Sequence, residues 1–259
     1  MTNDDHIEDP SASGGDESCQ GLARTIAKAG YGTRRQAEEM IRSGRVTVAG
    51  KRILDPGFGV TVGAEIRIDD REVVEVIRSY LAFHKPLNVA TSATVFHRTK
   101  LISQYLPPDI QGLAPAGRLD TSTSGLLLVS NDSKWNALAA SGHGFDKEFL
   151  LTVAGQVSEA QLGVIRAGMH IPKVGDIKPK SIDVLDRRDG TCHLNFVLQA
   201  GKIRQIRSLF TALRLDLQTI HRIRIGPVRL DSLGVSCWRP LDSLEIEKIR
   251  RGPSEPGKL

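Results

Sequence analysis

The stretch GRLDTSTSGLLLV, residues 117–129, constrains the fold more than any other part of the sequence. It sets one charged residue, Asp120, in a turn of small polar residues that is followed directly by an apolar run. A short apolar run bounded by turn residues predicts a buried strand, here over residues 126–129. The pattern therefore predicts a carboxylate at the edge of a core, surrounded by hydroxyl groups and backbone donors. The alternative is an Asx-type turn that only starts the strand.

A second stretch, GKIRQIR at residues 201–207, is strongly basic. A helix over residues 203–213 would place Arg204 and Arg207 on one face, because they are three positions apart, and apolar residues would bury the other face. The alternative is a solvated basic helix surface. A buried carboxylate needs a cation to stay ionised, and arginine keeps its proton in proteins. We therefore predict that Arg207 pairs with Asp120 and maintains it as an ionised nucleophile.

Strand and helix patterns do not alternate regularly along the rest of the chain. Apolar runs predict strands over residues 80–84, 149–153 and 193–198, while a polar turn at residues 131–133 is placed to cap a helix. This order differs from a repeating strand–helix unit, so the predicted fold class is α+β.

The beginning of the chain predicts a small separate module over residues 20–70. Two helices, the second capped by Thr33, precede a hairpin whose turn is Ala49-Gly50. Residues 21–53 hold eight Lys and Arg against two Glu, a net charge of +6. Such a basic module favours contact with nucleic acid, although a solvated helix face is the alternative. The candidate RNA-binding residues are Arg34, Arg35, Arg42 and Arg45.

Charge also distinguishes the beginning of the chain from its body. Residues 1–20 carry six acidic residues and no Lys or Arg, whereas the whole chain has a net charge of +5, so the remainder carries +11. This basic body indicates a polyanionic partner. Residues 1–19 and 252–259 are predicted to be disordered tails, and residues 71–79 a linker to a second domain over residues 80–251.

Several classes of protein do not fit the sequence. No apolar run approaches the roughly 20 residues that span a bilayer, and the first residues do not form a signal peptide. The three cysteines are odd in number and far apart, in no metal-binding spacing. We therefore expect a cytoplasmic, monomeric protein that needs no metal and no membrane.

Five motifs, in order over about residues 80–249, resemble the RsuA/RluB/RluE/RluF family of ribosomal RNA pseudouridine synthases. Residues 20–70 resemble the RNA-binding domain named after ribosomal protein S4, through TRR at residues 33–35 and GRV at residues 44–46. The family-like motifs are GRLDTSTSGLLL (117–128), GKIRQIR (201–207), KPLNV (85–89), KEFLL (147–151), and HRIRIGP (221–227) followed by Gly234 and RPL (239–241).

The resemblance implies a fold and a reaction. The fold would be a mixed, largely antiparallel sheet with flanking helices and a central cleft, preceded by a helix–helix–hairpin RNA-binding domain. The reaction would be site-selective isomerisation of uridine to pseudouridine in ribosomal RNA or an assembly particle, with no cofactor. Asp120 would attack the flipped nucleotide at the anomeric carbon or at carbon 6 of the ring, and Arg207 would orient it.

The resemblance also implies which residues contact the substrate. The candidates are Arg118, Phe149, Lys85, Lys202, Arg204 and Gln205. The family usually has Tyr where Phe149 stands, so stacking on the base is kept while a hydroxyl for proton transfer is lost. This departure favours the alternative of an inactive RNA-binding ribosome-assembly protein. A glycosidic hydrolase is a weaker alternative, because it would need a second nearby carboxylate.

Overall fold

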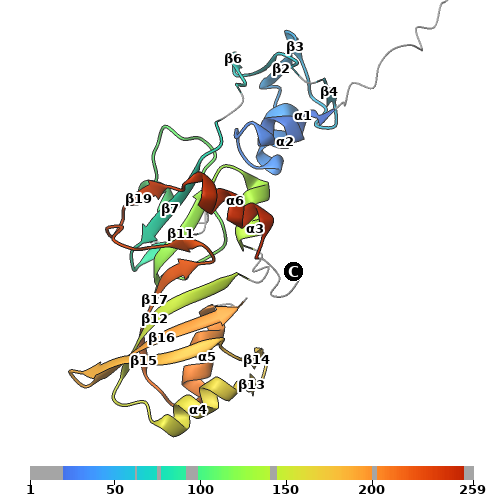
Figure 1. Ribbon diagram of the computed structural model, residues 1–259. Coiled ribbons are helices and arrows are strands. Elements are labelled where there is room, and N and C mark those ends of the chain that lie inside the picture. The colour runs from blue at the N-terminus through green and yellow to red at the C-terminus, as the bar shows by residue number, and fades with distance from the viewer. Residues whose placement is uncertain are drawn as a thin grey trace, which may run out of the picture. The chain divides into compact units, whose positions relative to one another are not determined.

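The computed structural model describes residues 20–61, 63–74, 77–91, 99–140, 145–199 and 203–253. The predicted tail over residues 1–19 lies outside this part of the chain, as does the predicted tail beyond residue 253. The chain divides into two compact units, residues 1–76 and 77–259, called here the N-terminal and C-terminal units (Figure 1).

The N-terminal unit is built from two short helices and small antiparallel sheets. Thr33 caps α2 through a capping box with Gln36, and Ala49-Gly50 turns the chain between β2 and β3 with positive φ at both residues. This bears out the predicted helices and hairpin. The core lies between both helices and the sheets. The elements are β1 (Gln20–Gly21), α1 (Leu22–Lys28), α2 (Arg34–Arg42), β2 (Val46–Val48), β3 (Lys51–Arg52), β4 (Gly59–Val60), β5 (Ile66–Ile68) and β6 (Arg71–Glu72).

The C-terminal unit is organised around one nine-stranded sheet. The strand order is β15-β16-β12-β17-β11-β7-β19, with β10 added to β11 and β18 to β17. All pairs are antiparallel except β11 with β17, which confirms the predicted α+β class and largely antiparallel sheet. The strands are β7 (Tyr80–Lys85), β10 (Ala114–Pro115), β11 (Ser124–Ser130), β12 (Asp146–Ala154), β15 (Ser181–Arg188), β16 (Thr191–Gln199), β17 (Leu217–Ile225), β18 (Val228–Arg229) and β19 (Trp238–Pro240).

Helices and short connecting elements cover the two halves of this sheet. In Figure 1, α3 and α6 lie beside β7 and β11, while α4 and α5 lie beside β15 and β16. The amphipathic α5 buries Ile206, Leu209 and Phe210 against β12 and β16. The remaining elements are β8 (Val89–Ala90), β9 (Lys100–Leu101), η1 (Ile102–Gln104), α3 (Ser133–Ala140), α4 (Glu159–Ala167), β13 (Met169–Ile171), β14 (Gly175–Ile177), α5 (Ile203–Ala212) and α6 (Ser243–Arg251).

The two halves of the sheet meet where β11 pairs with β17. This junction consists of two residue pairs, Ser124 with His221 and Gly125 with Arg222. Gly125 has φ +105°, and a Cβ there would lie 2.2 Å from the Arg222 carbonyl oxygen. The glycine is therefore required both by its backbone conformation and by the close approach of β17.

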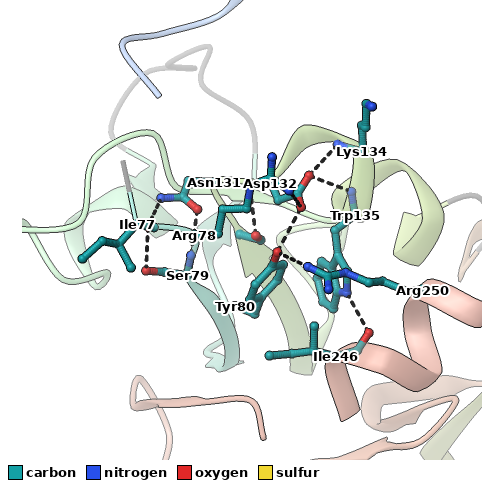
Figure 2. A network of polar contacts seen from close by, with 11 residues as sticks. Ile77, Arg78, Ser79, Tyr80, Asn131, Asp132, Lys134, Trp135, Ile246 and Arg250 are labelled. Atoms are coloured by element: carbon teal, nitrogen blue, oxygen red, sulfur yellow. Dashed lines mark hydrogen bonds and ion pairs between the residues drawn. The ribbon is translucent and has the colours of Figure 1, made fainter. Parts of the chain in front are cut away.

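A polar network fixes the start of the C-terminal unit (Figure 2). The buried Asp132 accepts hydrogen bonds from the Trp135 amide at the start of α3 and from the Tyr80 hydroxyl, and it pairs with Arg78. Arg250 of α6 donates to the same Tyr80 hydroxyl at 2.7 Å. Burial alone would raise the pKa of Asp132, but these hydrogen bonds and the charge of Arg78 outweigh it and lower the pKa.

Residues of the predicted linker, 71–79, take part in both units. Arg71–Glu72 forms β6, which pairs with β5 in the N-terminal unit. The Ser79 amide donates to Asn131 Oδ1 at 2.8 Å, and Asn131 Nδ2 donates to the Ile77 carbonyl. Residues 75–76 lie outside the described residues.

Candidate active site

Asp120 lies on the turn that precedes β11. The neighbouring side chains of Leu119 and Thr123 are buried and hold this turn against the core. The Ser122 hydroxyl donates to Asp120 Oδ1 at 3.2 Å, and the Thr123 amide donates to the Asp120 carbonyl. The carboxylate itself is 41% exposed. The expectation of a buried carboxylate was therefore wrong, because the turn anchors its flanking residues and leaves Asp120 open to solvent.

Arg207 of α5 reaches across to the same turn. Its Nε lies 3.5 Å from Asp120 Oδ2. Its Nη2 donates to the Ser122 carbonyl at 3.1 Å, the Ser122 hydroxyl at 2.8 Å and the Thr123 hydroxyl at 3.2 Å. The structure thus brings Asp120 and Arg207 together as the sequence predicted. The guanidinium holds the turn with three hydrogen bonds and also supplies a positive charge beside the carboxylate.

Lys85, a predicted substrate contact, lies inside the protein. Its side chain is fully buried, and Nζ donates to the carbonyl oxygens of Pro86 and Val89, each at 2.8 Å. Burial lowers the pKa of Lys85 to about 8, while the charge of Asp120 acts in the opposite direction. In this structure Lys85 therefore fastens the loop that follows β7 and offers no surface to RNA, which corrects the prediction.

Phe149, predicted to stack on the target base, is also part of the core. Its ring is 1% exposed and packs with apolar residues beneath α5. On the sheet it lies between Phe196 of β16 and Arg222 of β17. The ring therefore presents no open face in this structure. The prediction that it forms a stacking platform is corrected, because Phe149 is a buried core residue.

Cross-strand pairing places several of these residues in one row. Lys85 is opposite Gly125, Gly125 is opposite Arg222, and Arg222 is opposite Phe149. Side chains directly opposite each other in a sheet point to the same face. We call the face of this row that lies under α5 the floor. The floor therefore extends from Lys85 to the ring of Phe149. Lys85 lies near enough to Asp120 for its charge to act on the pKa of the lysine.

Two buried cations on this floor were missed by sequence reasoning. Arg222 is 5% exposed, and Lys147, two residues before Phe149 on β12, is 8% exposed. Burial lowers the pKa of Arg222 to about 9, and burial and the charge of Arg222 together lower the pKa of Lys147. The sequence carried no signal for this, because in HRIRI the apolar residues alternate with Arg222, and its burial on β17 is seen only in the structure.

The other predicted contacts have varied surroundings. Arg118 and Arg204 are exposed, and Gln205 is half-buried on α5. Lys202 lies outside the described residues. The four candidate RNA-binding residues, Arg34, Arg35, Arg42 and Arg45, are all exposed. Arg34 and Arg42 both pair with Glu38, and Arg45 pairs with Asp69.

In the part of the chain that the structure describes, no group of three or more His, Cys, Asp and Glu side chains is placed to hold a metal ion. No helix of the described ranges is long and apolar enough to cross a bilayer.

A carboxylate at a rigid turn, clamped by an arginine above a basic floor and preceded by a basic helix–helix–hairpin unit, is an arrangement that suits an RNA-modifying enzyme. Comparison with known proteins agrees. Residues 79–212 match the family model described as RNA pseudouridylate synthase, and residues 20–66 match the S4 domain. This chain belongs to the RNA pseudouridylate synthase family, which confirms the predicted family, enzyme class and S4-like domain.

Several relatives match most of the chain. Ribosomal large subunit pseudouridine synthase B of Bacillus subtilis (strain 168) is 29% identical, covering 88% of this chain and 95% of the relative. The protein of the same name from Escherichia coli (strain K12) is 31% identical, over 88% and 81%. A solved structure, described as the crystal structure of pseudouridylate synthase, has a TM-score of 0.61 at 29% identity, covering 88% of this chain and 99% of that chain.

Proposed function

We propose that this protein isomerises uridine to pseudouridine in ribosomal RNA, with Asp120 as the nucleophile. The observation that carries the proposal is the ion pair between the solvent-open Asp120 and Arg207 of α5. Family membership supports the reaction. The names of the B. subtilis and E. coli relatives support a large-subunit RNA as the substrate.

The surroundings of Asp120 suit attack on a nucleotide that has left its stack. A base inside a helix is out of reach, so the target must flip, at a cost of a few kcal/mol. A carboxylate that is 41% exposed can meet such a nucleotide without local unfolding. Either the anomeric carbon or ring carbon 6 is a possible point of attack. The glycosidic bond then breaks, the uracil turns, and a carbon–carbon bond forms.

Arg207 acts on the turn that carries Asp120, and Lys85 acts on the loop after β7, rather than on the RNA. Arg207 fixes the carboxylate by bonding to both neighbouring hydroxyl groups, and its charge favours the ionised form of Asp120. Lys85 holds the following loop by two carbonyl bonds. The exposed Arg118 and Arg204 contact phosphates or the flipped nucleotide, with Lys202 and Gln205 nearby in sequence.

Binding of the RNA outside the site falls to the N-terminal unit. Arg34, Arg35, Arg42 and Arg45 are exposed in a unit that matches the S4 domain. Because Glu38 neutralises part of the charge of Arg34 and Arg42, and Asp69 that of Arg45, Arg35 is the strongest candidate for a phosphate contact. Phosphate contacts position an enzyme on RNA without reading its sequence.

The test is tritium release from ribosomal RNA labelled at carbon 5 of uridine, offered as naked RNA and as assembly particles. Wild type is expected to release tritium, and Asp120→Asn to release none while RNA affinity stays within about threefold, because phosphate contacts dominate affinity. Asp189→Asn, at the exposed turn between β15 and β16, is the matched control and should behave as wild type.

Two results would contradict the proposal. Full activity of Asp120→Asn would exclude this nucleophile. Tight RNA binding by a wild type that releases no tritium from either substrate would favour the non-catalytic assembly protein. The absence of a hydroxyl at Phe149 is the observation that would then explain the loss of turnover.

A further inference from the structure

The floor beneath α5 carries more positive charge than the fold needs. Lys85, Arg222 and Lys147 all lie on this face and are 0%, 5% and 8% exposed. Within the described ranges none of the three forms an ion pair with a carboxylate. Lys85 is satisfied by two carbonyl oxygens. The other two cations remain to be explained, because a buried charge is unfavourable unless a partner compensates it.

One hydrogen-bond donor of Arg222 has no acceptor among the described residues. Its Nε donates to the Leu126 carbonyl of β11 at 2.7 Å. This bond accounts for a structural role, since it bridges β11 and β17 just beyond their last residue pair. Its Nη2 is fully buried and has no hydrogen-bond partner. A guanidinium offers five N–H groups in a rigid fork, so an oxygen arriving at Nη2 would be held in a defined direction.

The neighbours of Arg222 connect it to the segment that carries Asp120. On one side of it in the row is Gly125, where the missing Cβ makes room for the Arg222 backbone, and on the other is the ring of Phe149. Gly125 also belongs to the segment that carries Asp120. Lys147 adds a second positive charge near Arg222. The two side chains are close enough for the charge of Arg222 to lower the pKa of the Lys147 ammonium.

We propose that Arg222, supported by the charge of Lys147, binds a ring carbonyl oxygen of the flipped uracil through its buried Nη2. The inference rests on the proposed function and names the group that recognises the base. A base edge is favoured over a phosphate because a flipped base enters deepest, whereas the phosphates stay among the exposed Arg118 and Arg204. Arg222 is only 5% exposed, so an inserted base can approach its guanidinium while the RNA backbone stays out of reach.

The symmetry of uracil gives this contact a particular use. When the bond between N1 and the sugar breaks, its electron pair stays with the uracil and is shared with the two carbonyl oxygens. A half-turn about the axis through N3 and C6 brings C5 to the place of N1 and exchanges O2 with O4. One fixed guanidinium therefore finds an equivalent oxygen before and after the turn. The same donor can hold the detached base at its charged stage.

The experiment combines substitutions of Arg222 with replacement of each uracil carbonyl oxygen by sulfur. Single-turnover rates of pseudouridine formation are measured with uridine, 2-thiouridine or 4-thiouridine at the target position. Sulfur is the weaker acceptor, so wild type is expected to slow about tenfold on at least one thio substrate. Arg222→Met is expected to be about 100-fold slower on uridine, with no further loss on either thio substrate and with RNA affinity within about threefold of wild type.

Arg224→Met is the matched control. Arg224 is two residues along β17, but the register with β12 shifts between Glu148 and Phe149, so Arg224 pairs with Glu148 on the opposite face. This variant should therefore keep the full thio sensitivity of wild type. Arg222→Lys keeps a charge and covers the case in which Arg222→Met does not fold. It should recover part of the rate together with part of the thio sensitivity.

The outcomes separate the two hypotheses. A wild-type rate for Arg222→Met, or a slow variant of Arg222 that keeps the thio sensitivity of wild type, would overturn the contact and leave the nucleophile untouched. No pseudouridine from wild type on any of the three substrates would instead refute the proposed function itself.

Discussion

Lys85 illustrates how burial changes the behaviour of a single residue. The folded protein lowers its pKa to about 8 from an ordinary value of 10.5. Between these pH values the unfolded chain binds more protons than the folded chain, so the free energy of unfolding rises with pH. Below pH 8 both states are protonated and the full cost of burying the charge remains.

We expect this titration to be visible in a comparison of wild type with Lys85→Met. Between pH 8 and 10.5, the free energy of unfolding of wild type should rise by on the order of 2 kcal/mol relative to that of Lys85→Met. Urea denaturation at several pH values measures the difference, with Lys100→Met at an exposed position as the control. A difference that stays constant across this range would show that Lys85 is not a buried charged group.

Some site residues could be predicted correctly from the sequence and others could not, for a physical reason. Asp120 and Arg207 could be predicted because a charged turn before an apolar run and a basic amphipathic helix are local patterns. The burial of Lys85 and Phe149 depends on strands far along the chain that cover them, so their local sequence could not reveal it. The position of Arg222 beside Phe149 depends on the register of β17 with β12, which no local pattern specifies.

Among the elements, the junction of β11 and β17 depends on one glycine. Gly125→Ala would combine a positive φ with a Cβ 2.2 Å from the Arg222 carbonyl oxygen and 2.6 Å from its amide nitrogen. Because these contacts are with backbone, side-chain rearrangement cannot relieve them. We expect a loss of more than about 3 kcal/mol in the free energy of unfolding.

Gly190→Ala isolates the conformational part of this effect. Gly190 has φ +70°, and no atom lies within 4 Å of the position that an alanine Cβ would take there. The substitution should therefore cost only about 1 kcal/mol. Denaturant titrations of both variants provide the comparison. Equal losses at the two glycines would mean that β17 does not approach Gly125 as closely as described.

Elements with strong local signals were predictable, and others were not. The N-cap of α2 at Thr33 and the apolar run of β11 were recognised from the sequence because their signals lie within a few residues. The strand character of β17 was not predicted, although HRIRI alternates charged and apolar residues as a strand does, because this stretch was noted only as a family motif. The helices α4 and α6 also begin with capping boxes, which would have located them.

For the whole molecule, the two units predict a division of labour. Deleting residues 1–70 removes the basic N-terminal unit but leaves β7 and its network with Asp132 intact. RNA affinity should fall about 10-fold to 100-fold and become less sensitive to salt, because fewer phosphates are contacted. The single-turnover rate at saturating RNA should change by less than about threefold.

Filter binding over a range of salt concentrations, together with single-turnover assays, measures both effects. Deletion of the acidic residues 1–19 alone serves as the control, since it keeps the basic unit. Unchanged affinity after removal of residues 1–70 would mean that the C-terminal unit binds the RNA by itself.

The edge strand β19 has a consequence for how the protein is made. Its residue Pro240 lies opposite Leu81 of β7, and Arg250 of α6 bonds to Tyr80. One edge of β7 pairs with β11, but the other edge stays open until β19 has been synthesised, whereas β2, β5 and β6 of the N-terminal unit pair with one another within a short stretch of chain. During translation the N-terminal unit is thus completed first, and the sheet of the C-terminal unit, the unit that carries Asp120, is completed later.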